Sequence, residues 1–202
     1  MNKYVYGLSL GYKEYVVDLK KSHGKAERDY FSRESYDRFM AGEIQSLSTQ
    51  KNVTRTADGL YCHHVAENRE TALSNPENIR AFNLPFEYQE ARNLVYCDII
   101  EHAILHILIA VEKRNDEAIL GLRGYTNAIR PEIIDWFVKE QVPETPWKKR
   151  CYDAIELRPR DVEKLINFMD KFLTTHYPID QSYLDLAYEA YHLSPADKKA
   201  LA

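Results

Sequence analysis

Four of the seven histidines in this chain fall into two close pairs whose spacing suits metal chemistry. His63 and His64 are adjacent in the segment 59–65, which follows an Asp-Gly turn signal and is expected to form a short strand. Neighbours on a strand point to opposite faces, so one of the two can bind a metal ion while the other faces a substrate phosphate. His102 and His106 are four residues apart, and on a helix this spacing places both imidazoles on one face, close enough to share an ion. Three imidazoles with an open fourth position describe a catalytic metal site better than a closed structural one.

Each pair also has an ordinary structural explanation. A histidine pair at helical spacing occurs more often by chance than as a metal site, and the apolar neighbours of His106 suit a buried core residue. The order of elements along the chain favours the metal site. A short strand with the adjacent histidines is followed by a loop, the dipeptide Asn93-Leu94, and a predicted helix over 98–113 that carries the second pair.

This order resembles the HNH, or ββα-metal, nuclease family, and in particular its histidine-rich branch of colicin-type DNases. The likeness covers roughly residues 58–110. The matching positions are a His-His pair with a small apolar residue after it, an asparagine with an apolar residue after it, and two helical histidines: His63-His64-Val65, Asn93-Leu94, His102 and His106. The chain departs from the family in the long interval between the strand and the asparagine, which predicts an inserted helix around 76–82, and in lacking paired Cys-x-x-Cys motifs.

The resemblance implies an α+β fold that is mostly α-helical, with a small ββα-metal core embedded between N- and C-terminal helical regions. The expected parts are a mainly helical region over 1–57, the nuclease core over 58–115 and a second helical region over 116–202, packed together as one compact unit.

The resemblance also implies a role for each residue of the motif. His63, His102 and His106 would bind the metal ion. His64 would be the general base that activates a water molecule, and Asn93 would hold the loop that bears His64 and orient its imidazole. A neutral imidazole, whose ordinary pKa is about 6.5, can accept a proton at neutral pH.

The function implied by this set is a metal-dependent endonuclease that hydrolyses phosphodiester bonds in DNA, as in small bacterial or phage proteins of restriction, phage defence or mobile elements. Three imidazoles suit Zn²⁺ or Ni²⁺ as ligands, whereas Mg²⁺ or Mn²⁺ would support cleavage. The alternative is a non-catalytic, zinc-stabilised nucleic-acid-binding or adaptor protein. The second histidine beside His63 favours the enzyme, because a purely structural site does not need it.

Cationic residues that could contact phosphates lie near the motif and in one C-terminal cluster: Arg69, Arg92, Lys148, Lys149 and Arg150. A groove for nucleic acid and a solvated helix end explain the cluster equally well. The formal net charge is −4, whereas an autonomous DNA-binding protein is usually basic. We therefore expect a homodimer or a partner subunit to supply substrate recognition.

The remaining composition indicates a cytoplasmic protein that does not enter a membrane. Three cysteines without a disulfide framework are typical of a reducing compartment. The first ten residues contain no apolar leader, and the most apolar stretch, 99–111, is interrupted by polar residues and too short to span a bilayer.

Apolar periodicity predicts further helices outside the motif. Residues 25–47 follow a helical rhythm, and 12–20 fits either a strand or a helix. In the C-terminal region the pattern predicts helices over 130–141, 160–175 and 183–192.

Overall fold

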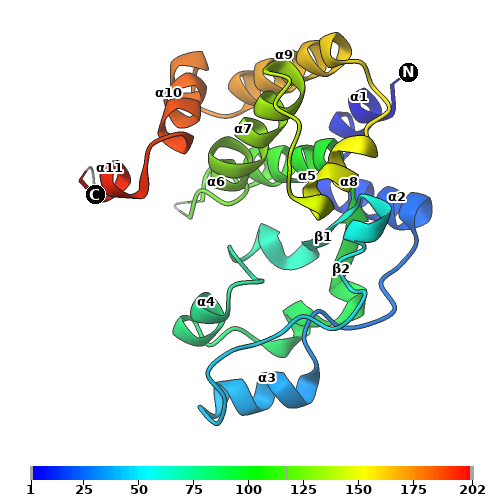
Figure 1. Ribbon diagram of the computed structural model, residues 1–202, viewed down its shortest axis with the longest axis vertical. Coiled ribbons are helices and arrows are strands. Elements are labelled where there is room, and N and C mark those ends of the chain that lie inside the picture. Colours follow the sequence, from blue (N-terminus) through cyan, green and yellow to red (C-terminus); the bar gives the residue numbers. More distant parts are fainter. Residues whose placement is uncertain (1, 117, 201–202) are drawn as a thin grey trace.

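The computed structural model describes residues 2–116 and 118–200, in which helices surround one two-stranded sheet (Figure 1). The predicted α+β, mostly helical class is confirmed. The α-helices are α1 (Lys3–Leu8), α2 (Tyr12–His23), α3 (Arg33–Met40), α4 (Pro76–Ala81), α5 (Ile99–Glu112), α6 (Leu122–Gly124), α7 (Arg130–Ile133), α8 (Pro146–Asp153), α9 (Pro159–His176), α10 (Gln181–Tyr191) and α11 (Pro195–Ala200).

The sheet is a pair of short antiparallel strands, β1 (Tyr61–His64) and β2 (Leu94–Cys97), with His63 opposite Val95. The strand predicted around the adjacent histidines is therefore confirmed. Only Asp98 separates β2 from α5, and the segment 93–96, whose sequence fits either an extended segment or the start of a helix, forms most of the second strand.

The start of α5 is fixed by its acidic residues. Asp98 is the N-cap and accepts the backbone N–H groups of Ile100 and Glu101, while the Glu101 carboxylate accepts the N–H of Asp98, which forms a capping box. Lys3 of α1 and His23 at the end of α2 both bind Glu101. The N-terminal helices are thereby tied to the first turn of the helix that carries His102 and His106.

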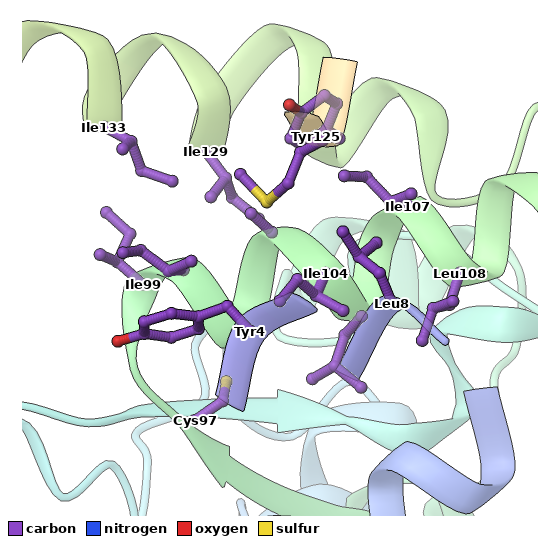
Figure 2. Packing of buried hydrophobic residues seen from close by; sticks show 14 of the residues in the cluster. Tyr4, Leu8, Cys97, Ile99, Ile104, Ile107, Leu108, Tyr125, Ile129 and Ile133 are labelled. Carbon is purple, nitrogen blue, oxygen red and sulfur yellow. The ribbon is translucent and has the colours of Figure 1, made fainter. Parts of the chain in front are cut away.

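α5 is the central helix of the main hydrophobic core and is buried along almost its whole length. Figure 2 shows Ile104 near Tyr4 and Leu8 of α1, and Tyr125 and Ile129 of the next helical segment packing over α5. Each fully buried aliphatic side chain contributes roughly 1.5–3 kcal/mol, so the rotation of α5 about its axis is strongly determined. The two histidines on this helix consequently have little freedom to move.

A second hydrophobic cluster lies beside the sheet, where α3, α4 and the connection between the strands come together (Figure 1). Its buried members are Phe31, Tyr36, Phe39, Ala66, Leu73, Ile79, Leu84 and Phe86. The N-terminal region thus divides between the two clusters, because α1 and α2 pack with α5 whereas α3 packs with the segment inserted between β1 and β2.

The helices outside the motif agree with the sequence patterns in part. α9, α10 and the inserted α4 are close to their predicted ranges, and the ambiguous segment 12–20 is helical. The helix predicted over 25–47 is wrong at both ends, because only α3 forms there and Gly42, with φ of 79°, follows its end. The helix predicted over 130–141 is part of a longer helical run from Leu122 to Val138 that includes two π-helical segments.

Within the described residues, none of these helices has both the length and the apolar character to cross a membrane.

Candidate metal centre

Three imidazoles converge where β1 meets α5. His63 comes from the strand, and His102 and His106 come from one face of the helix, with ring centroids 4.9–5.2 Å apart. One nitrogen from each ring lies within 4.8 Å of the nitrogens of the other two. The structure therefore brings together the three side chains that the sequence predicts as metal ligands.

A buried tyrosine determines which nitrogen of His63 carries the proton. The hydroxyl of Tyr12 lies 3.0 Å from His63 Nε2 and donates its single proton to the carbonyl of Val65 at 2.9 Å. The hydroxyl must then accept the Nε2 proton, which leaves Nδ1 of His63 unprotonated. A metal-binding histidine is commonly oriented in this way, through a hydrogen bond from its other ring nitrogen.

The remaining nitrogens fit a divalent cation. Nδ1 of His63 and Nδ1 of His102 are buried with no hydrogen-bond partner among the described residues. Leaving such a group unpaired costs about 1–3 kcal/mol, which a bound ion would offset. In His106 the unpartnered Nδ1 faces Gly124, whereas Nε2 faces Glu67 and is the nitrogen available to an ion. Burial, with the neighbouring imidazoles, holds the pKa of His63 and His102 well below 6.5, and burial lowers the pKa of His106 to about 4. All three rings are thus neutral at physiological pH, as metal ligands must be.

A carboxylate that the sequence analysis missed lies beside the imidazoles. Glu67 is in the 3₁₀ turn Val65–Asn68 directly after β1, and its Oε2 is 3.2 Å from His106 Nε2 and 3.7 Å from His63 Nδ1. Its side chain is only 17% exposed, and burial raises its pKa to about 8. The signal in the sequence is a glutamate four residues after His63.

Two glycines allow the next helix to approach the centre closely. A Cβ at Gly124 of α6 would lie 2.3 Å from Nδ1 and Cε1 of His106, and one at Gly121 would lie 2.4 Å from the backbone oxygen of the same residue. Gly121 also has φ of 75°, a conformation that favours glycine. The position of the His106 ring therefore depends on the absence of a side chain at residue 124.

Replacing Gly124 by alanine should weaken metal binding. The added methyl group overlaps the His106 ring and must displace it, and we expect the affinity for Zn²⁺ to fall by about 10–100-fold, the range seen when the supports of a ligand are removed. Competition with a coloured chelator measures the change. Gly11→Ala is the matched control, because its Cβ would make only ordinary contacts at 3.5 Å or more. Equal affinities of the Gly124→Ala variant and the wild type would show that the ring is not held by this contact.

The centre opens onto a pocket of about 400 Å³. Glu67, His102 and His106 form part of its wall, and Arg123 of α6 lines the same pocket. Arg123 is exposed, so its charge is accessible to a ligand. Donors for a metal ion and a cation suited to phosphate oxygens thus share one pocket.

His64 is directed to the other face of β1. It is 1% exposed, packs against the Tyr30 ring at 4.5 Å, and binds Gln89 Oε1 through Nε2 at 3.1 Å. The Gln89 amide nitrogen donates to the carbonyl of Leu73, so its oxygen accepts the Nε2 proton of His64. Burial lowers the pKa of His64 to about 4. His64 is not among the described residues that line the pocket.

Asn93 supports a loop, although not through a contact with His64. Its side-chain amide donates to the carbonyl of Glu87 at 2.7 Å and ties together the loop that precedes β2. The residue that holds the His64 imidazole is Gln89, which the sequence analysis did not identify. Gln89 is fully buried and lies 25 residues beyond its partner, so no local pattern indicates the contact.

Four of the five cationic residues predicted to contact phosphates are engaged with acceptors of the protein itself. The pairs are Lys148 with Glu132, Lys149 with Asp153, Arg92 with Glu90, and Arg150 with the carbonyl of Thr56. The fifth, Arg69, is exposed. None of the five is among the described residues that line the pocket of the metal centre, whereas Arg123 is.

Comparisons with protein-family models, curated proteins and solved structures found no match to this chain. The resemblance to HNH nucleases stays a prediction from the residues of the sequence motif.

Proposed function

We propose that this protein is a metal-dependent hydrolase of phosphodiester bonds, an HNH-type endonuclease that acts on DNA. The observation that carries the proposal is the convergence of three neutral imidazoles from one strand and one helix, two of which, His102 and His106, line an open pocket. A metal site of three protein nitrogens beside an open pocket suits catalysis.

The residues of the centre and its pocket would have separate roles in this reaction. His63, His102 and His106 would hold the divalent ion, either Zn²⁺ or Ni²⁺, which suit imidazole, or Mg²⁺ or Mn²⁺ during cleavage. When bound, the ion would stabilise the negative charge on the phosphate and the leaving oxygen. Arg123, which lines the same pocket, would bind the phosphate oxygens.

Two residues are candidates for the base that accepts a proton from the attacking water. The likeness to the HNH family favours His64, and the hydrogen bond to Gln89 keeps its second ring nitrogen, Nδ1, unprotonated as a base requires. Glu67 lies closer to the ion-binding nitrogens and lines the pocket. The proposal takes His64 as the base, and the assay described next tests that choice.

Cleavage of plasmid DNA tests the proposal, with the metal-free chain supplemented by Mg²⁺, Mn²⁺ or Zn²⁺ in turn. The wild type should nick or linearise the plasmid, and His64→Ala should slow this by about 10²–10⁴-fold, the usual contribution of a general base. His176→Ala, which removes an exposed histidine of α9, should cleave like the wild type. Equal rates for the wild type and His64→Ala would remove His64 from the mechanism. No cleavage by the metal-loaded wild type with any of the ions would contradict the hydrolase function.

A zinc-stabilised nucleic-acid-binding or adaptor protein is the second candidate. The burial of His64 and its hydrogen bond to Gln89 favour it, because a histidine that packs in the interior can serve structure alone. This candidate predicts that the ion stabilises the fold while no ion supports cleavage.

Delivery of the substrate is proposed to involve a second copy of the chain or a partner subunit. The net charge is −4, and most of the cationic residues predicted to contact phosphates are paired with acceptors of the protein. Tight, salt-sensitive binding of DNA by the isolated chain would contradict this part of the proposal.

A further inference from the structure

We propose that Glu67 is a fourth protein ligand of the metal ion, so that the resting centre is a three-histidine, one-carboxylate site. The ligand assignment does not require cleavage of DNA. Its consequence for substrate access, given below, rests on the proposed function.

The distances around the Glu67 carboxylate are those of neighbouring ligands. Donors held at 2.0–2.1 Å from a tetrahedral zinc ion lie about 3.3 Å from one another. Oε2 of Glu67 is 3.2 Å from His106 Nε2 and 3.7 Å from His63 Nδ1, the nitrogen that the Tyr12 hydroxyl leaves unprotonated. The carboxylate is therefore placed at one corner of the donor set.

The ionised form of Glu67 would be stabilised by a cation at the centre. Its side chain is 17% exposed, and the groups beside its Oε2 are two imidazoles that are neutral at physiological pH. A buried carboxylate without a positive partner is costly. A divalent ion at the centre would neutralise the carboxylate and would also satisfy Nδ1 of His63, which has no hydrogen-bond partner among the described residues.

The turn after β1 holds Glu67 in this place. Residues 65–68 form a 3₁₀ turn, and the carbonyl of Val65, the first residue of that turn, accepts the hydrogen bond of Tyr12. Tyr12 thus bonds both to the His63 ring and to the turn that carries Glu67. One buried hydroxyl fixes the relative position of two members of the donor set.

The position of Glu67 has a consequence for the substrate. Glu67, His102 and His106 line the pocket, whereas His63 is not among its described lining residues. A phosphate that enters from the pocket therefore meets the Glu67 carboxylate next to the ion. Under the proposed function, the phosphate would take up the position of Glu67 at the ion and release the carboxylate toward the pocket.

Metal affinity tests the ligand assignment without reference to cleavage. The full chain is stripped with a chelator, and its affinity for Zn²⁺ is measured by competition with a coloured chelator. Glu67→Gln should weaken binding by at least about 10–100-fold, the loss already caused by removing an outer partner of a ligand. Glu70→Gln removes an exposed carboxylate three residues away and should bind Zn²⁺ like the wild type.

The absorption spectrum of the Co²⁺-loaded protein reports the ligand itself. Glu67→Cys should add a thiolate-to-cobalt charge-transfer band in the near ultraviolet, which the wild type lacks, because a thiolate at this position would bind the ion directly. The Glu67→Cys variant also tests the ligand assignment if Glu67→Gln does not fold, and circular dichroism would show whether each variant folds.

Unchanged Zn²⁺ affinity of Glu67→Gln, or the absence of the new band in the Co²⁺-loaded Glu67→Cys variant, would overturn the assignment. If the wild type binds Zn²⁺ through Glu67 but cleaves no DNA, the ligand assignment stands and the hydrolase function fails. The two proposals can therefore be separated.

Discussion

Zn²⁺ should raise the free energy of unfolding of this protein by about 4 kcal/mol when the free ion is about a thousand times more concentrated than its dissociation constant. The folded chain holds three ligand nitrogens within 4.8 Å of one another, whereas unfolding separates His63 from His102 and His106 by a long loop. Binding to the folded state alone converts the binding free energy into stability. For a chain of this length the thermal midpoint should rise by roughly 8–16 °C, at about 2–4 °C per kcal/mol.

His102→Ala should abolish most of this increase, because it removes one of the three imidazoles. His176→Ala should keep it, since that exposed histidine lies outside the cluster. Thermal and denaturant unfolding with and without a chelator measure the difference. If Zn²⁺ stabilised His102→Ala as much as the wild type, the ion would bind elsewhere on the chain, and the centre described here would be a set of packed core histidines.

The parts of the centre that could be predicted follow from local rules. Alternation along a strand separates His63 from His64, and a four-residue interval places His102 and His106 on one face of a helix. The start of α5 could also be read locally, because Asp98 and a glutamate three residues later are the signature of a capping box.

The parts that could not be predicted depend on contacts between distant segments. Gln89 reaches His64 only because the connection between the strands folds back over β1, and Gly124 meets His106 only because α6 packs closely on α5. Glu67 reaches the centre through a 3₁₀ turn that no periodicity indicates. A sequence pattern describes which face of one element a residue occupies, and it does not describe which other element covers that face.

The prediction of phosphate-binding residues from clusters of basic residues also failed because it depends on contacts between distant segments. The run from Lys148 to Arg150 is strongly basic in the sequence, yet in the fold Glu132 and Asp153 bind its two lysines. Arg123 has no basic neighbours in the sequence and was not predicted, although it lines the pocket of the centre. Whether a cation can meet a phosphate depends on the carboxylates that packing brings to it.

The metal-free protein should lose stability as the pH rises from 6.5 to 8, and Glu67 should be the cause. Burial raises the pKa of Glu67 from 4.5 to about 8 in the folded chain. Between these two values the folded state keeps a proton that the unfolded state has lost, so the free energy of unfolding falls by about 1.4 kcal/mol for each pH unit. Over the interval from 6.5 to 8 the expected loss is about 2 kcal/mol.

The histidines act in a different pH range, which allows the effect of Glu67 to be isolated. Burial lowers the pKa of His64 and His106 to about 4, so their contribution to stability rises with pH between 4 and 6.5 and is constant above that range. Glu67→Gln should therefore remove the loss between pH 6.5 and 8, while the exposed-site control Glu70→Gln should retain it. Urea unfolding in the presence of a chelator measures both slopes. Equal slopes for Glu67→Gln and the wild type would mean that the carboxylate is already ionised in the metal-free fold.

With Zn²⁺ bound, the free energy of unfolding should instead rise with pH, because the ion binds the ionised carboxylate and a rise in pH favours the loaded, folded state.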